Sequence, residues 1–135
     1  MRRLFVQSLA KQRNAIVSDG KQIAMSYYDE TLIPAAGLII LPIEGGPPTK
    51  RFKLLLDYEG FGRRFRWMLD GSAVLYIDDR RANIWSQPIN GGEPTQLTDF
   101  QGDELFDFAY SPDGNWLAVA RGKVTEDVLM ITDLN

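Results

Sequence analysis

The chain has 135 residues, a formal net charge of -3, 44% apolar residues and 24% charged residues. This composition is typical of one globular domain, and the acidic balance gives no electrostatic argument for nucleic acid or an anionic membrane as partner. The chain contains no Cys and no His, which excludes thiol nucleophiles, His general bases and zinc sites built from thiolate or imidazole ligands.

The first segment, MRRLFVQSLAKQR, resembles the basic start of a signal peptide. Gln7 and Ser8 interrupt its apolar part, which falls short of the roughly 7 to 15 apolar residues of a real hydrophobic region. No apolar run reaches the ~18 residues that span a bilayer. We therefore predict that residues 3–9 form a strand of the fold, and that the compartment is cytoplasmic by default.

A repeated pattern follows. Asp-Gly pairs occur at 19–20, 70–71 and 113–114, and Gly-Gly pairs occur at 45–46 and 91–92. When the units are aligned on Asp-Gly, apolar residues fall at matching offsets: Ile23, Val74 and Leu117, then Met25, Tyr76 and Val119. Later positions match in the same order: Leu38 with Ile84 and Val128, Ile39 with Trp85 and Leu129, Pro42 with Pro88, and Glu44 with Asn90. The agreement predicts one structural unit repeated three times.

Each unit is predicted to be a small sheet. Its apolar runs are short, rich in Ile, Val, Leu, Tyr and Trp, and bounded by Gly, Pro, Asn and Asp, which indicates strands rather than helices. Four short strands on a period of roughly 40 to 50 residues are typical of a β-propeller blade. The predicted blades are residues 14–56, 61–100 and 105–135, within a single β-propeller segment 1–135.

Three segments carry a family resemblance: SPDGNWLAVARG, DVLMITDLN and NIWSQPINGGEPTQLTDF. They resemble the repeat of TolB-like propellers, a WD-related β-propeller family whose units combine an aromatic-Ser-Pro-Asp-Gly turn with Gly-Gly and Leu-Thr. The match is good over residues 83–135. It is weaker over 14–82, where Leu69 and Ser18 replace the Pro of the motif, and RFKLLL stands in place of Leu-Thr.

The resemblance implies a propeller fold and an interaction role. Such propellers follow a kinase or DNA-binding domain in larger bacterial proteins, and this chain resembles their C-terminal part. The resemblance carries no catalytic residues, and it leaves a periplasmic location open.

About three blades are too few for a propeller, which usually has 4 to 8. The third unit ends after its third predicted strand, so we expect residues 3–9 to supply the missing outer strand of a blade. We predict a homodimer in which two half-propellers form a six-bladed ring with two-fold symmetry, because no apolar blade face is then left open. A fragment of a longer propeller, an open arc of blades and a different fold are the alternatives.

The turn Ser111-Pro112-Asp113-Gly114 is interpreted as mechanical rather than catalytic, because Asp-Gly persists in all three units whereas Ser and Pro do not. Two acidic clusters are also candidates. The first groups Asp99, Asp103, Glu104 and Asp107; these carboxylates suit Ca²⁺, but Glu104 stands where an EF-hand loop needs Gly, which favours a polar loop. The second is Asp78-Asp79-Arg80-Arg81, either an ion or carboxylate site or, as we favour, a solvated hairpin.

A basic and aromatic stretch, Arg63-Arg64-Phe65-Arg66-Trp67, follows Lys50, Arg51 and Lys53 and has the composition of a nucleic-acid or anion-binding surface. Phe65 and Trp67 match Phe108 and Tyr110, however, which favours blade core. Gly60-Phe61-Gly62 lacks the remaining residues of a phosphate loop. The three tryptophans, Trp67, Trp85 and Trp116, recur on predicted strands, which indicates packing rather than a sugar-binding platform.

The sequence therefore predicts a non-catalytic binding or scaffold module for protein–protein interaction, with no metal and no cofactor. The expected partners are a second copy of the chain and an unidentified protein or peptide, without nucleic acid or membrane insertion. The binding residues are not identified. The alternatives are a ligand-binding or carboxylate-based hydrolytic propeller with its site at the central channel, and a remnant of a regulatory module.

Overall fold

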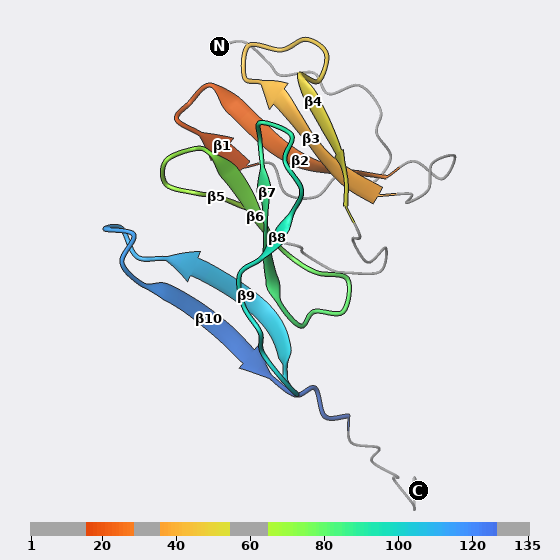
Figure 1. Cartoon of the computed structure of the whole chain (residues 1–135), viewed down its shortest axis with the longest axis vertical. Helices are drawn as coiled ribbons and strands as arrows, with labels where there is room; N and C mark the ends of the chain where they lie inside the picture. Colours follow the sequence, from red (N-terminus) through yellow and green to blue (C-terminus); the bar gives the residue numbers. More distant parts are fainter. Residues whose placement is uncertain (1–15, 29–35, 55–64, 127–135) are drawn as a thin grey trace, which may run out of the picture.

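The structure, a computed structural model, describes residues 16–28, 36–54 and 65–126. Within these ranges the chain forms three antiparallel sheets and no helix. The sheets follow one another in chain order down the long axis of the molecule (Figure 1). The prediction of an all-β chain is confirmed, while the described sheets do not close into a ring or barrel. The predicted strand 3–9, and Val128 and Leu129, lie outside the described residues.

The first two sheets have the four strands that the repeat predicts. The first contains β1 (Ile16–Ser18), β2 (Gln22–Tyr28), β3 (Ala36–Pro42) and β4 (Lys50–Lys53) in that order. The second contains β5 (Arg66–Trp67), β6 (Ala73–Ile77), β7 (Ile84–Pro88) and β8 (Thr95–Gln96) in the same order. The third pairs β9 (Glu104–Tyr110) with β10 (Leu117–Gly122). Because strands adjacent in the chain pair with each other, short antiparallel connections suffice.

The strand register confirms that the first two sheets are copies of one unit. Met25 pairs with Ile39 as Tyr76 pairs with Trp85. One backbone bond is also repeated: the Ile43 amide donates to the Lys21 carbonyl at 2.9 Å, and the Ile89 amide donates to the Ser72 carbonyl at 3.0 Å. The predicted alignment on Asp-Gly therefore matches equivalent positions in space.

Each sheet has two faces, because successive side chains of a strand point to opposite sides. We call the face turned toward the next sheet in chain order the forward face, and the opposite one the backward face. The forward face of the first sheet packs on the backward face of the second, in a cluster that includes Ala24, Leu38, Ile40, Phe65, Trp67, Val74 and Tyr76. The forward face of the second packs on the backward face of the third, through Leu75, Ile77, Ile84, Leu105 and Phe108.

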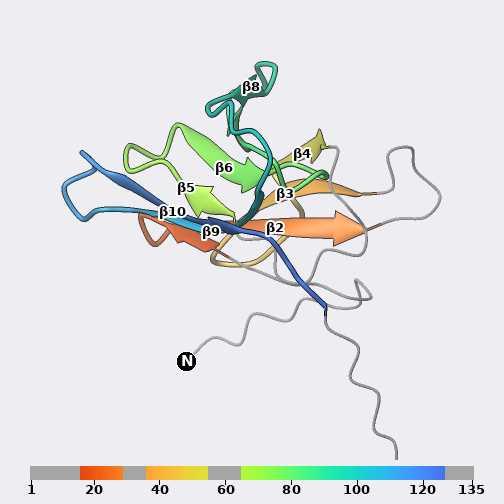
Figure 2. The same ribbon diagram turned by 90° about the horizontal axis from the view of Figure 1, so that it is seen from below.

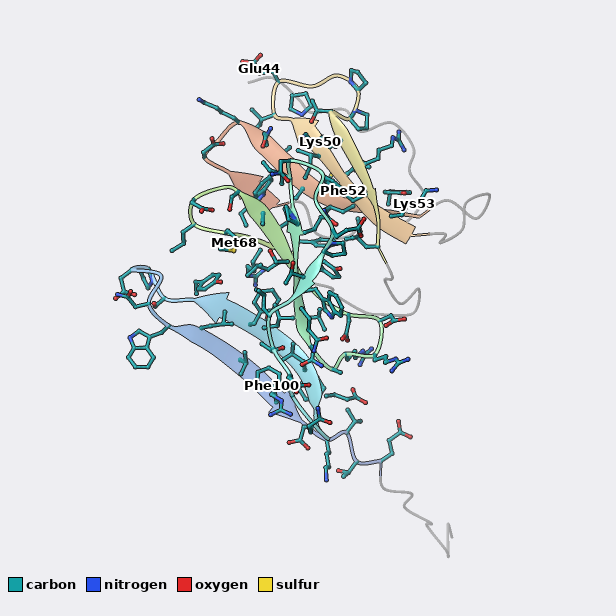
Figure 3. All side chains as sticks on the ribbon, in the orientation of Figure 1. Glu44, Lys50, Phe52, Lys53, Met68 and Phe100 are labelled. Carbon is teal, nitrogen blue, oxygen red and sulfur yellow. The ribbon has the colours of Figure 1, made fainter. Side chains whose placement is uncertain are left out.

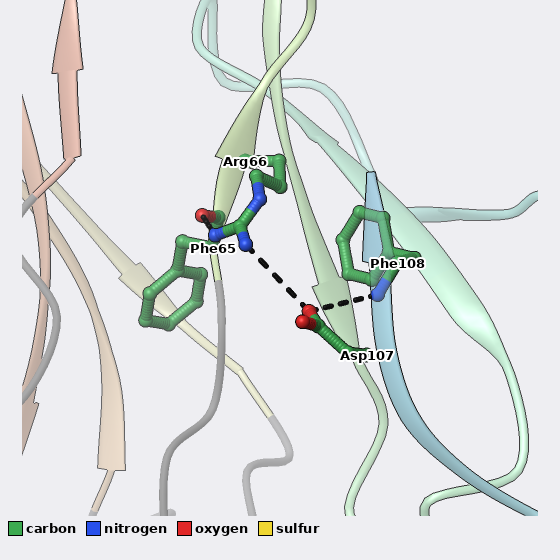
Figure 4. Close-up of polar contacts among 4 residues, drawn as sticks. All are labelled: Phe65, Arg66, Asp107 and Phe108. Carbon is green, nitrogen blue, oxygen red and sulfur yellow. Dashed lines mark hydrogen bonds and ion pairs between the residues drawn. The ribbon is translucent and has the colours of Figure 1, made fainter. Parts of the chain in front are cut away.

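The first strands of the three sheets approach one another. β1 contacts β5, and Arg66 of β5 forms an ion pair with Asp107 of β9 at 3.6 Å (Figure 4). In the view of Figure 2, the outer strands β4 and β8 lie toward the top of the picture, and β5 and β9 lie lower in it. The sheets therefore fan outward from a line of first strands.

Candidate interaction surface

Three equivalent turns lie along one side of the molecule, at the left of Figure 1, where each sheet passes from its first to its second strand. Their glycines, Gly20, Gly71 and Gly114, have φ of 75°, 71° and 73°, which is the left-handed region that glycine adopts without cost. The preceding aspartate accepts a bond from the amide two residues further on, at 3.1 Å from Lys21, 2.9 Å from Ser72 and 3.1 Å from Asn115. The prediction that Asp-Gly is a turn element is confirmed.

Ser111 serves the third turn. Its hydroxyl donates to the Asp113 carboxylate and accepts a bond from the Trp116 amide at 3.0 Å. The Ser111 bond, followed by those from Asn115, lowers the pKa of Asp113, and the Ser72 bonds lower the pKa of Asp70 in the same way. These bonds favour the ionised carboxylates. Any contribution they make to the stability of the fold is therefore present above the ordinary pKa near 3.8 and is lost as the pH falls below it.

Replacing Gly114 with valine is expected to destabilise the protein by about 2 kcal/mol, because a β-branched residue is strained at φ 73°. A Cβ there would also lie 2.4 Å from Cδ1 of Leu69, which belongs to the neighbouring turn. Urea unfolding measures the loss. Ser111→Ala in the same turn is the control and keeps the backbone geometry, so equal unfolding midpoints for the two variants would contradict this account.

The loop between β6 and β7 is more than the solvated hairpin that the sequence predicts. The Asp78 carboxylate is half-buried and accepts bonds from the amides of Ala82 and Asn83 at 2.8 and 3.2 Å, and from the indole of Trp85 at 3.3 Å. Asp79 and Arg80 are exposed, as expected. Asp78 therefore fixes the shape of the loop, because it satisfies donors that the turn leaves without backbone partners.

This loop also holds the second sheet to the third. Arg81 pairs with Glu104 at 3.4 Å, and its carbonyl accepts a bond from the Leu105 amide at 2.7 Å. The side-chain oxygen of buried Asn83 accepts bonds from the Thr98 hydroxyl at 3.0 Å and the Phe100 amide at 2.7 Å. Nearby, the Arg121 guanidinium lies over the ring of Phe100, the residue labelled where the third sheet meets the connecting loop in Figure 3.

The four carboxylates considered for calcium do not converge. Glu104 is directed to Arg81 and Asp107 to Arg66, while the Asp99 carboxylate accepts a bond from Gln101 at 3.0 Å. Within the described part of the chain, no three acidic side chains are placed to share a metal ion. Two of these carboxylates, Glu104 and Asp107, instead link the third sheet to residues of the second.

The basic stretch is divided between core and edge. Phe65 and Trp67 are buried between the first two sheets, as the match with Phe108 and Tyr110 predicts, and Arg66 pairs with Asp107. Arg63, Arg64 and residues 60–62 lie outside the described residues. Lys50, Arg51 and Lys53 are exposed on the outer strand β4 (Figure 3). Charges on such an edge discourage pairing with another strand.

Burial of Tyr76 between the first two sheets, together with the nearby Asp78 charge, raises the pKa of its phenol to about 12. The unfolded chain releases this proton near pH 10, so stability is expected to fall between about pH 10 and 12, by up to roughly 1.4 kcal/mol per unit. Urea unfolding at pH 8 and pH 11 measures the decrease. The Tyr76→Phe variant should lose less stability between these two pH values than the unaltered protein. An equal loss in the two proteins would contradict the assignment to Tyr76.

The tryptophans divide in a way that the sequence does not predict. Trp67 is buried and Trp85 packs against the same cluster, as expected. Trp116 is 75% exposed, so the prediction of packing is wrong for it within this chain. Trp116 directly precedes β10, two residues before Ala118, on the forward side of the third sheet, where no further described sheet follows.

This forward face is an exposed apolar surface of the described residues, and we call it the open face. Ala109 pairs with Ala118, so the two share a side of the sheet, and Trp116 and Ala120 lie two residues from Ala118 on the same side. Phe106, which is 43% exposed, approaches Gly122 at the far end of the strand pair. All of the named alanines are exposed. The open face therefore has an aromatic residue at each end and, between them, alanines and Asp107, which stands opposite Ala120 in register.

The fold and this surface define a class: an all-β chain of stacked small sheets, in which the last of the described sheets presents an uncovered apolar face. No protein-family model matches the sequence, and no curated protein matches it significantly. In the part of the chain that the structure describes, nothing forms a helix long and apolar enough to cross a membrane.

Proposed function

We propose that the chain is a non-catalytic binding module built of propeller-type blades, and that it acts by associating with other proteins through the open end of its stack of sheets. The first partner is a second copy, and two copies of three blades complete a six-bladed ring. The TolB-like resemblance of residues 83–135 supports the blade assignment. Further protein or peptide partners would bind the completed assembly.

One observation carries this proposal: the open face is exposed, while the equivalent faces of the other two sheets are covered. Ala118 stands at the repeat position of Ala24 and Leu75, which are fully buried against the following sheet. An uncovered apolar face in a stack of otherwise covered ones is typical of an association surface. Exposure of these apolar side chains to water is unfavourable, and their burial against a partner sheet would stabilise the assembly.

The hydrolytic alternative finds no comparable support. The described groups with displaced pKa are Asp70, Asp113 and Tyr76. Two of them belong to separate turns and the third to the packing between sheets, so they do not form one site.

The test is the mass of the protein in solution at micromolar concentration. The unaltered chain is expected to be a dimer. Ala118→Lys should weaken the dimer by on the order of 100-fold or more, because an unpaired charge buried in an interface costs several kcal/mol. Thr95→Lys on the outer strand β8 adds the same charge elsewhere and should leave the dimer intact. A monomeric unaltered chain would refute self-association.

A further inference from the structure

The two junctions inside the chain follow one rule, in which a forward face receives the backward face of the next sheet. Two faces have no described sheet packed against them. One is the open face of the third sheet. The other is the backward face of the first sheet, an apolar cluster of Ile23, Met25, Tyr27, Ile39 and Leu41.

We infer that the open face receives the backward face of the first sheet of a second copy, so that two such junctions close the dimer. This inference rests on the proposed self-association and names its contact surfaces. It extends to the partner a contact that the chain already makes twice. Each junction therefore joins two different surfaces, and the two equivalent junctions are related by the two-fold axis of the dimer.

The sizes of the side chains agree with this pairing. Ala24 on the forward face of the first sheet is fully buried in a cluster with Val74 and Tyr76 of the second. A forward face with alanine at this position therefore already accepts bulky side chains from the next sheet. Ala118 holds the same position in the third sheet, and the backward face of the first sheet offers Met25 and Tyr27.

The charged side chains of the two faces lie at different places. On the receiving face, Arg51 and Lys53 stand on the outer strand β4, opposite Ile39 and Gly37 in register. On the open face, Asp107 of β9 stands opposite Ala120 in register, and its carboxylate is already paired with Arg66 of its own chain. The residues that form the open face are otherwise alanine and aromatic side chains. A partner with an apolar surface therefore suits this face better than one that recognises charge.

The receiving face is not vacant in the single chain. Its five side chains are at most 9% exposed, so the partner sheet has to displace their present cover. Association is therefore an exchange of contacts, as in domain swapping. We expect it to be slow for folded protein and fast when two copies fold together.

Cysteine cross-linking tests the pairing cleanly, because the natural chain has no Cys. An Ala118→Cys chain and a Met25→Cys chain with a longer affinity tag are unfolded together, refolded as a mixture and treated with a short bifunctional maleimide. At least ten-fold more covalent dimer is expected from the mixture than from either chain alone. Tyr27→Cys provides a second position on the receiving face, and Thr95→Cys replaces it in the control mixture.

The outcomes separate this inference from the proposed function. Efficient cross-linking of Ala118→Cys to itself, in a protein with dimeric mass, would show that two open faces meet each other; it would overturn the pairing and leave self-association standing. A dimer with no cross-link from either receiving position would also overturn the pairing. A monomeric mass would overturn both proposals.

Discussion

Replacing Gly37 with alanine is expected to destabilise the protein by about 3 kcal/mol or more, the upper part of the range for overpacking a filled interior. A Cβ at this position would lie 2.3 Å from the Phe52 carbonyl oxygen and 2.6 Å from Cε1 of Tyr27. The carbonyl belongs to β4, which pairs with β3 at Leu38 and Phe52. It cannot retreat without weakening that pairing, so the sheet has to distort.

The measurement is the free energy of unfolding in urea, compared with Gly92→Ala. The nearest atom to a Cβ at Gly92 is 3.6 Å away, and its φ lies outside the left-handed region. Alanine there should be neutral or should stabilise by about 0.4–1 kcal/mol, because it restricts the unfolded chain. Similar unfolding midpoints for the two variants would mean that Gly37 is not tightly enclosed.

Asn83→Ala is expected to cost about 2–3 kcal/mol, because it leaves the Phe100 amide and the Thr98 hydroxyl without their acceptor. Thr98 also accepts a bond from the Ile84 amide at 2.9 Å. Loss of Asn83 therefore loosens a connected set of bonds between the second sheet and the loop that leads to the third. Buried polar networks of this kind are costly when only part of the network is satisfied.

Thermal or urea unfolding detects the Asn83 effect. Asn90→Ala is the control. Asn90 is exposed, and the change removes the bond that its side-chain oxygen accepts from the Gly92 amide at 3.2 Å. That change should remain within about 0.5 kcal/mol of the unaltered protein. If Asn83→Ala were equally mild, the network would not contribute to holding the loop.

The repeat could be predicted from sequence because its signals are local. Asp-Gly specifies a turn through the backbone of two residues, and the alternation of apolar residues follows within a few positions, so Ile23, Val74 and Leu117 could be aligned without knowledge of the fold. Gly37 could not be singled out from the sequence. The space that a side chain at this position would need is filled by the ring of Tyr27, which pairs with Gly37 from the neighbouring strand β2.

The role of Asn83 had a partial signal in the sequence. The Leu97-Thr98 pair belongs to the family-like pattern, and the structure gives its Thr a physical task, which is to bridge Ile84 and Asn83. Asp78 was noted in the sequence as part of a charged hairpin, but its role in fixing the loop was not predicted, because its three donors come together only in the folded loop. The exposure of Trp116 depends on which sheet follows it, a question that the pattern within one repeat does not address.

The order of strands has a consequence for how fast the chain folds. Every described pairing joins strands that are consecutive in sequence, so each sheet can form from one continuous stretch without closing a long loop. Folding rates rise as the separation between contacting residues falls. Each sheet can therefore nucleate by itself during synthesis and grow by addition of its neighbours, as in proteins whose stability propagates from one repeat to the next.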